Sequence, residues 1–290
     1  MTDEAAHFVD LHTHSTASDG SRTPREVVRA AHDLGLVAIA LTDHDTVDGL
    51  GDAYDEGRSL GVRVIAGIEL SAVESNAETH LLGLHLTEVD RLAARLRDLR
   101  TMRLTRAERI VKRLNELGVK VTIEEVLEQA AGGAVGRPHI ARALVNDGWA
   151  TDVRDAFDRY LGSGRPAFVA KDRLSMSDAI AMIHDAGGLA VLAHPGSAGT
   201  RARIEALTGI GLDGVEVKHP SHSAEDAARM LALVDHFRLV PSGGSDWHGL
   251  SDGGRALGGM RVPLAWIGRQ EQAVATRARP RNGDHQAFVA

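Results

Sequence analysis

Short apolar runs recur along this chain of 290 residues, and many of them end in a histidine or an acidic residue. The runs alternate with segments of helical periodicity, a pattern typical of βα units with buried parallel strands. Such units build either an open doubly wound sheet or a closed barrel. A barrel gathers the carboxyl ends of all its strands around one mouth, whereas an open sheet spreads them along an edge. Because polar residues follow so many different runs, we expect an α/β barrel.

The expected barrel elements form two groups. In the first group we expect strands at 8–12, 36–41, 62–68 and 81–86, with helices at 24–34 and 48–60. In the second group we expect strands at 189–193, 214–218 and 239–242, with helices at 175–186, 200–208 and 223–236. Thr23 and Glu26 have the spacing of a capping box around Pro24, which predicts the start of the first helix.

The rhythm changes between these groups. One long amphipathic helix, or a broken pair, is expected from Asp90 to Leu117, and shorter helical pieces follow at 123–130, 138–146 and 152–161. We therefore predict a small helical domain at 88–165, inserted into a barrel domain made of 1–87 and 166–265. The last residues, 266–290, have little apolar content, and we expect them to form a mobile tail.

Composition narrows the class of protein. The chain is 43% hydrophobic and 25% charged, which is sufficient for a full core, and its net charge of −7 disfavours wholesale wrapping of nucleic acid. It has no cysteine, which excludes disulfides and thiolate metal sites. The acidic N-terminus lacks the apolar stretch of a signal peptide, and no run approaches the ~20 apolar residues of a membrane span. We expect a cytoplasmic protein with no membrane association and no obligate protein partner.

Imidazoles and carboxylates dominate the polar residues that follow the apolar runs. His12 and His14 point to one face of their strand, because side chains two residues apart share a face. Gly243 and Gly244 permit a close backbone approach before Asp246. The candidate metal ligands are His12, His14, Asp19, His44, Glu69, His80, His194, Asp246 and His248, and Asp43 shares their placement.

Nine ligands are too many for one ion and suit two or three divalent ions with a bridging carboxylate. Mixed imidazole and carboxylate donors suit Mn, Fe or Zn, and ligand softness does not separate the three. We expect Mn, with Zn or Fe as alternatives. Ions clustered about 3.5–4 Å apart are the usual means of cleaving phosphate esters. With no cysteine and no Gly-x-Ser-x-Gly elbow, the sequence offers no evident protein nucleophile.

Four motifs together resemble those of the PHP (polymerase and histidinol phosphatase) family of metal-dependent phosphoesterases. They are His-Thr-His-Ser-x-x-Ser-Asp-Gly at 12–20, Leu-Thr-Asp-His-Asp-Thr at 41–46, Ala-His-Pro-Gly at 193–196 and Gly-Ser-Asp-x-His-Gly at 244–249. Gly-Arg-Pro-His at 136–139 is similar to the branch that contains nucleoside 3′,5′-bisphosphate phosphatase and the RNase AM-like 5′–3′ exoribonuclease. The resemblance implies a distorted (β/α)7, TIM-like barrel that holds a trinuclear site.

The resemblance also implies how the ligands are shared. His12, His14, Glu69 and Asp246 would hold one ion, Glu69, His80 and His194 a second, and Asp19, His44 and His248 the third. It implies that a hydroxide bridging two ions attacks phosphorus, with His194 and His219 beside it at the catalytic centre.

Cations are needed to orient a substrate phosphate. Arg137 is the first candidate, because a guanidinium can grip two phosphate oxygens, although a surface cation capping its loop is an equal alternative. The other candidates are His139, Lys171, His219 and His222, of which His219 and His222 could also protonate a leaving oxygen. For Lys171 a surface role is favoured. The arginine-rich helix at 91–113 could contact RNA phosphates, but a solvated helix face is the favoured interpretation.

The expected function is hydrolysis of phosphate monoesters of nucleotides. The substrate would be a nucleoside 3′,5′-bisphosphate such as pAp, or a nucleoside monophosphate, with 5′–3′ trimming of short oligoribonucleotides as a related activity. One alternative is a histidinol-phosphate-like small-molecule phosphatase. Another is a catalytically silent, metal-dependent nucleic-acid binding module.

Overall fold

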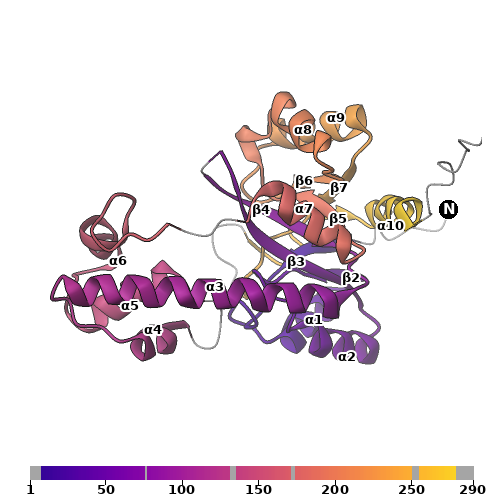
Figure 1. The fold of residues 1–290 in the computed structure, drawn as a ribbon. Helices are drawn as coiled ribbons and strands as arrows, with labels where there is room; N and C mark the ends of the chain where they lie inside the picture. The colour runs from indigo at the N-terminus through magenta and orange to yellow at the C-terminus, as the bar shows by residue number, and fades with distance from the viewer. Residues whose placement is uncertain (1–7, 76, 131–134, 171–173, 250–254, 279–290) are drawn as a thin grey trace, which may run out of the picture. The chain divides into compact units, whose positions relative to one another are not determined.

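The computed structural model describes residues 8–75, 77–130, 135–170, 174–249 and 255–278 (Figure 1). It divides into two compact units, one made of Met1–Leu92 with Ser175–Ala290 and the other of Ala93–Leu174. The second unit begins and ends a few residues later than the insertion expected at 88–165. We call the two the barrel unit and the helical unit.

The barrel unit contains one mixed sheet that curls almost closed. Its strands are β1 (Phe8–Thr13), β2 (Ala38–Leu41), β3 (Arg63–Glu74), β4 (Ala77–Leu84), β5 (Leu189–Leu192), β6 (Gly214–Lys218), β7 (Val240–Gly243) and β8 (Val262–Pro263). The spatial order is β7-β6-β5-β4-β3-β2-β1-β8. After β7 the chain returns alongside β1, where the Asp246 amide donates to the His12 carbonyl at 2.9 Å. The fold is therefore the expected TIM-like α/β barrel.

Strand β4 departs from the all-parallel arrangement that we expected. It runs antiparallel to both β3 and β5, because β3 and β4 form a hairpin. Ser71 pairs with His80 in this hairpin, so the beginning of β4 lies beside the second half of β3. As a result, His80 reaches the barrel mouth from the first half of its strand and not from a strand's carboxyl end.

Helices surround the sheet of the barrel unit. They are α1 (Pro24–Asp33), α2 (Leu50–Leu60), α7 (Met176–Asp185), α8 (Arg201–Gly209), α9 (Ala224–Phe237), α10 (Ala265–Ala278) and the 3-10 turn η2 (Gly196–Ala198). The capping box of Thr23 and Glu26 at the start of α1 is confirmed. The core beneath these helices includes Val9, Leu11, Leu82 and Val191, all fully buried.

Helix α10 occupies part of the segment expected to be a mobile tail. Ile267 packs into the barrel core, together with Trp266 and Val274. Gln270 is fully buried, and its amide donates to the Pro241 carbonyl at 2.8 Å. The few apolar residues of this segment are therefore enough to hold an ordered helix, because they lie on the one face that covers the core. Residues 279–290, the rest of the expected tail, lie outside the described residues.

The helical unit has its own core. Its elements are α3 (Val89–Glu116), which starts in the barrel unit, α4 (Ile123–Ala130), α5 (Arg137–Asn146), α6 (Val153–Ala156) and the π-helical turn η1 (Phe157–Leu161). Ile110, Leu114, Val126, Ile140 and Leu144 are among its buried residues. None of the helices in the described ranges is long and apolar enough to cross a membrane.

Candidate metal centre

The turn after β1 is held in place by a buried carboxylate. Asp43 accepts hydrogen bonds from the Ser15 amide and the Ser15 and Ser18 hydroxyls, each at 2.7 Å. These bonds fix the loop that carries Asp19. Asp43 thus anchors the site, whereas its neighbour His44 faces the other candidate ligands.

Glu69 lies at the centre of the barrel mouth and presents its two carboxylate oxygens to different imidazoles. Its Oε2 lies 3.0 Å from Nε2 of His12 and 3.1 Å from Nε2 of His14. Its Oε1 lies 2.9 Å from Nδ1 of His80 and 3.0 Å from Nε2 of His194. Asp246 Oδ1 joins the first set, 3.2 Å from Nε2 of His14. One buried carboxylate therefore links two groups of nitrogen donors.

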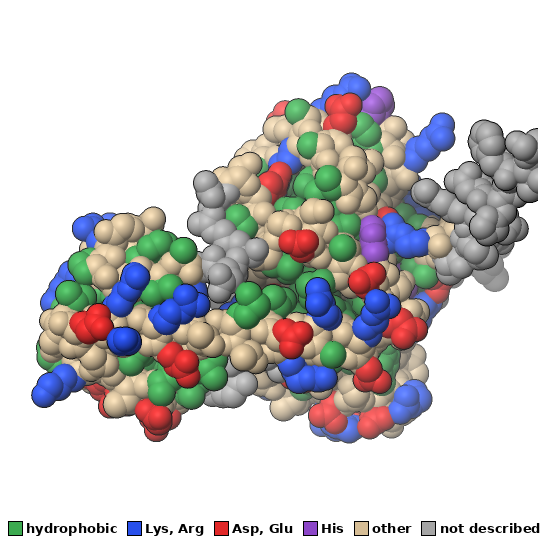
Figure 2. All heavy atoms as spheres, in the orientation of Figure 1, with side chains coloured by type: hydrophobic (Ala, Val, Ile, Leu, Met, Phe, Trp, Pro, Cys, Tyr) green, Lys and Arg blue, Asp and Glu red, His purple; other side chains and the backbone are tan. Residues whose placement is uncertain are grey.

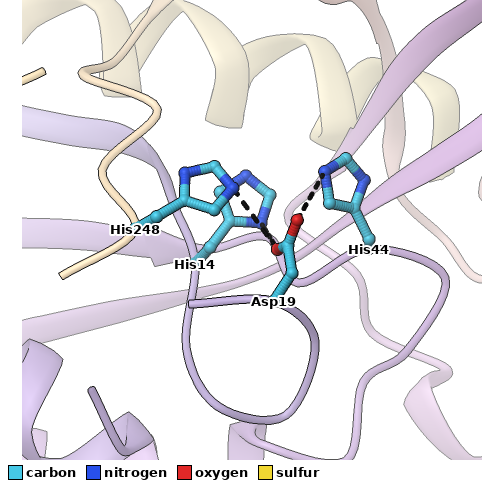
Figure 3. A group of neighbouring side chains, drawn as sticks. All are labelled: His14, Asp19, His44 and His248. Atoms are coloured by element: carbon cyan, nitrogen blue, oxygen red, sulfur yellow. Dashed lines mark ion pairs between the residues drawn. The ribbon is translucent and has the colours of Figure 1, made fainter. Parts of the chain in front are cut away.

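A third group gathers around Asp19 (Figure 3). The Asp19 carboxylate lies between His248 and His44, with Oδ1 at 3.3 Å from Nε2 of His248 and Oδ2 at 3.9 Å from Nε2 of His44. Nδ1 of His14 is 3.8 Å from Oδ1, so the two nitrogens of His14 face two different groups. The structure thus brings all nine candidate ligands to one mouth.

The donor atoms have the arrangement that a metal cluster requires. Among the described residues, both nitrogens of the fully buried His14 ring lie near carboxylate oxygens, but neither makes a contact with hydrogen-bond geometry. Buried polar groups without a partner are rare, and metal coordination would satisfy both nitrogens. The ligand atoms lie within 4.8 Å of one another in three sets of candidate ligands, which are His12, His14, Glu69 and Asp246; His14, Asp19, His44 and His248; and His44, Glu69 and His80. The residues present therefore fit divalent cations.

Two of these side chains sit on strained backbone. His194 has φ of 30° and Asp246 has φ of 52°, in the left-handed region that costs a residue with a side chain on the order of 1–3 kcal/mol. Gly244 makes the bend before Asp246 possible, because a Cβ there would lie 2.4 Å from Cβ of His12. This backbone conformation directs both side chains toward the mouth.

The site is electrostatically prepared for cations. Burial alone would raise the pKa of Glu69, but the surrounding imidazoles, His12 foremost, hold it well below its usual range. The pKa of Asp246 is likewise lowered despite burial, by contacts with His14 and His219. Burial would lower the pKa of His14, yet Asp246 and Glu69 outweigh it and raise the value to about 9. The carboxylates are ionised, and a metal must displace protons from some imidazoles.

Three residues of this site were not identified from the sequence. The buried Asp10 accepts from the amides of Ser245 and Gly258 at 2.9 and 2.8 Å, which ties β1 to the segments around Asp246. Glu216 contacts His12, and Arg255 forms an ion pair of 3.1 Å with Asp246 Oδ2. The position of Glu216 between Val215 and Val217 was an available signal, because a lone carboxylate within a barrel strand points to one face.

The histidines after β6 have local partners. His222 donates from Nδ1 to the Val217 carbonyl at 3.0 Å and accepts at Nε2 from the Gly196 amide at 3.1 Å. Both nitrogens are thus occupied, and the ring connects the loops after β5 and β6. His219 accepts at Nδ1 from the Ser221 amide, and its Nε2 lies 3.4 Å from Asp246 Oδ2. His219 lies at the mouth, whereas His222 connects the two loops and does not contact the candidate ligands through either ring nitrogen.

The remaining candidate phosphate ligands belong to the helical unit. Arg137 donates to the Leu161 carbonyl at 3.1 Å, and its guanidinium lies 5.5 Å from the ring centre of Phe157. His139 accepts from the Gly136 amide at 3.0 Å and so caps α5. Lys171 lies outside the described residues. The contacts of Arg137 and His139 within this unit are those of residues that stabilise it.

Two basic residues of α3 bind backbone carbonyls of their own unit. Arg106 is buried and donates twice to the Val169 carbonyl, at 3.0 and 2.9 Å, and Arg113 donates to the Phe168 carbonyl. Figure 2 shows acidic side chains interspersed with the basic ones along the visible face of each unit. This distribution agrees with the favoured interpretation of a solvated helix face.

Comparison with known proteins agrees with this geometry. The PHP domain model matches residues 10–167. A 3′,5′-nucleoside bisphosphate phosphatase of Chromobacterium violaceum is 35% identical over 86% of this chain and 90% of its own. The 5′–3′ exoribonuclease Rnm of Escherichia coli is 36% identical over 84% of this chain and 86% of its own. A phosphoribosyl 1,2-cyclic phosphate 1,2-diphosphodiesterase of Eggerthella lenta is 37% identical over 83% of this chain and 94% of its own.

A solved structure shares the fold. A protein of Bifidobacterium adolescentis, assigned as a metal-dependent phosphoesterase, superposes with a TM-score of 0.74 at 30% identity and covers 95% of this chain and 98% of its own. The clustered imidazoles and carboxylates at the barrel mouth, together with these relatives, identify a metal-dependent phosphoric ester hydrolase. The chain belongs to the PHP domain family, as the matching model and these relatives establish.

Proposed function

We propose that the nine residues hold two or three divalent cations, with Glu69 as the bridging ligand. The observation that carries the proposal is the division of the Glu69 carboxylate, whose Oε2 faces His12 and His14 while Oε1 faces His80 and His194. Six imidazoles and three carboxylates suit manganese, zinc or iron, and we propose manganese as the first candidate. When bound, the ions would supply an activated water and neutralise the charge of the phosphate oxygens.

His219 takes a positioning role in this proposal and not the general-acid role expected from the sequence. It is only 2% exposed. With Nδ1 accepting from the Ser221 amide, Nε2 carries the proton and faces Asp246 Oδ2 at 3.4 Å. This contact orients the Asp246 carboxylate toward His14. His194 serves as a ligand beside the catalytic centre.

Arg255 is the cation that we propose for the substrate phosphate. Its side chain is 42% exposed and lies at the mouth, where it pairs with Asp246 Oδ2 at 3.1 Å. A guanidinium in this position can contact Asp246 with one nitrogen and a phosphate oxygen with another. Arg255, in the barrel unit, is therefore our first candidate for binding the substrate phosphate, in place of Arg137 in the helical unit.

The substrate class follows from the relatives. We propose a phosphate monoester of a nucleotide, with nucleoside 3′,5′-bisphosphate first and short 5′-phosphorylated RNA second. The relatives named for bisphosphate phosphatase and exoribonuclease activity support this choice, since each aligns over most of its length. The third relative makes a cyclic phosphodiester of ribose a third candidate, because its identity to this chain is similar.

A substrate panel tests the proposal. Adenosine 3′,5′-bisphosphate, AMP, histidinol phosphate, a 5′-phosphorylated tetraribonucleotide and phosphoribosyl 1,2-cyclic phosphate are assayed at equal concentration with Mn²⁺, and with Zn²⁺ or Fe²⁺ in parallel. We expect the bisphosphate to have the highest kcat/KM. Preference for histidinol phosphate, or equal rates throughout, would contradict the substrate assignment. Binding of the RNA without turnover of any substrate would instead support a silent binding module.

A further inference from the structure

Glu216 is a fully buried carboxylate on β6 that contacts two candidate metal ligands. Its two oxygens face opposite sides. Oε1 lies 3.0 Å from Nδ1 of His12, and Oε2 accepts from the backbone amide of His194 at 2.7 Å. Glu216 is separated from these partners by 204 and 22 residues, so the barrel fold creates the arrangement.

The contact with His12 fixes both the orientation and the tautomer of the ring. A carboxylate can only accept, so Nδ1 must carry the proton. Nε2 points at Glu69 Oε2, 3.0 Å away, and at Asp246 Oδ1, 3.4 Å away, and it can coordinate once a metal displaces its proton. Metal-binding histidines commonly donate their second nitrogen to a carboxylate in this way.

The contact with His194 holds a strained turn. The His194 backbone has φ of 30°, a conformation that persists only where surrounding contacts impose it. The 2.7 Å bond from its amide to Glu216 is such a contact. It places the ring so that Nε2 reaches Glu69 Oε1 at 3.0 Å. Glu216 thus supports one imidazole on each side of the Glu69 carboxylate.

We propose that Glu216 is a positioning residue that couples two metal subsites through His12 and His194. The inference rests on the proposed metal centre and adds to it, because Glu216 would act through His12 and His194. Glu216 also lies within ligand distance of His12 and His219, but it contacts Nδ1 of His12, whereas Nε2 is the nitrogen that faces Glu69 and Asp246. Loss of the carboxylate would weaken both subsites together, since each loses the support of one imidazole. Mutation of a carboxylate that hydrogen-bonds to a metal-binding histidine typically lowers metal affinity by about 10–100-fold.

The barrel unit offers a matched control. Asp213, just before β6, accepts from Nε2 of His184 at 2.9 Å and from the Ala190 amide at 2.8 Å. This pair of contacts, one imidazole and one backbone amide, repeats that of Glu216. Neither Asp213 nor His184 is among the grouped candidate ligands. The Asp213 side chain is 13% exposed and also pairs with Arg277. Asp213→Asn therefore removes a largely buried carboxylate with a similar pair of contacts, away from the metal centre.

The test measures Mn²⁺ binding and stoichiometry by competition with a chelator for the wild-type protein, Glu216→Gln and Asp213→Asn. We expect Glu216→Gln to bind both subsite ions about 10–100-fold more weakly and Asp213→Asn to match the wild type. Equal binding by all three would overturn the role of Glu216. Weakening of one ion alone would overturn the coupling. If the wild-type protein binds no Mn²⁺, the proposed metal centre fails, which is a separate result.

A second measurement covers the case in which Glu216→Gln does not fold. In the wild-type protein loaded with Zn²⁺, nitrogen NMR of the imidazoles reports which ring nitrogen of His12 is protonated. We expect a slowly exchanging proton on Nδ1. A proton on Nε2, or rapid exchange at Nδ1, would overturn the inference.

Discussion

Nε2 of His12 lies 3.0 Å from Oε2 of Glu69, at the centre of a barrel mouth where both side chains are almost completely buried. The two residues come from β1 and β3. An ionised carboxylate is costly to bury unless it is paired, and here imidazoles on both oxygens provide that pairing. The same pairing makes Glu69 the residue on which two ligand groups depend.

Glu69→Gln is therefore expected to disable the enzyme while the barrel persists. The amide keeps the size of the side chain but cannot present two anionic oxygens to the two ligand groups. Loss of a residue that only hydrogen-bonds to a metal ligand typically costs about 10–100-fold in activity. We expect kcat/KM for the best substrate of the panel to fall by more than this. The measurement is steady-state kinetics with saturating Mn²⁺, alongside circular dichroism.

Glu56→Gln is the control for this change. Glu56 is a nearly buried carboxylate on α2 that pairs with Arg29 at 2.7 Å and is not among the grouped candidate ligands. Its replacement should leave kcat/KM within about twofold. If Glu69→Gln behaved like Glu56→Gln, Glu69 would not be a bridging ligand.

Metal affinity is expected to increase with pH between 7 and 9. The pKa is raised to about 9 at His14 and to about 10 at His80, in both cases because carboxylates, Glu69 among them, outweigh the effect of burial. Both rings are thus protonated at pH 7 before metal binds, and a metal must displace those protons. For each proton that the metal displaces, the apparent metal affinity rises by at most about tenfold per pH unit.

Calorimetric titration of the metal-free protein with Mn²⁺ at pH 7, 8 and 9 measures this dependence, and proton release follows from the use of two buffers. The same raised pKa values stabilise the metal-free fold at low pH, and that contribution is lost as the pH rises through about 9–10. An affinity that falls or stays level over this range would contradict protonated ligands.

Arg255→Ala is expected to weaken substrate binding. Hydrogen bonds to charged groups contribute about 1.5–3 kcal/mol, so KM should rise about 10–100-fold. With Mn²⁺ saturating, kcat should change much less, which separates loss of phosphate binding from loss of metal. Arg63→Ala is a control, because Arg63 pairs with Glu271 and is similarly exposed. An unchanged KM in Arg255→Ala would remove Arg255 from the substrate site.

Gly244→Ala is expected to destabilise the barrel. The added Cβ would lie 2.4 Å from Cβ of His12 and 2.5 Å from its backbone nitrogen, so β1 or the turn must shift. Overpacking of this kind costs about 1–3 kcal/mol. Gly268→Ala within α10 meets nothing within 4 Å and should be neutral or stabilise by up to about 1 kcal/mol. Urea unfolding of both variants measures the difference, and equal stability would contradict the close approach.

The sequence predicted the barrel and the gathering of the nine candidate ligands because most of these residues follow apolar runs. A residue in that position lies at the mouth whatever the details of packing. His80 was the exception. Its strand is antiparallel, and an apolar run carries no information about strand direction, so the hairpin of β3 and β4 could not be predicted from periodicity.

Residues that act through other side chains are harder to predict from the sequence. Glu216 and Asp10 lie inside strands, where alternation shows that a carboxylate points to one face of the sheet but not whether that face is the core or the solvent side. Helix α10 was missed because its contribution is a few side chains, such as Ile267 and Gln270, on one face. In each case the partner is distant in sequence, and only the fold brings it near.

The most direct test of the account is anomalous diffraction from a crystal of the protein soaked in Mn²⁺. The account predicts separate anomalous peaks on the two sides of the Glu69 carboxylate, one within coordination distance of His12 and His14 and the other beside His80 and His194. Absence of both peaks at full soaking, or a single peak that Glu69 does not contact, would contradict it.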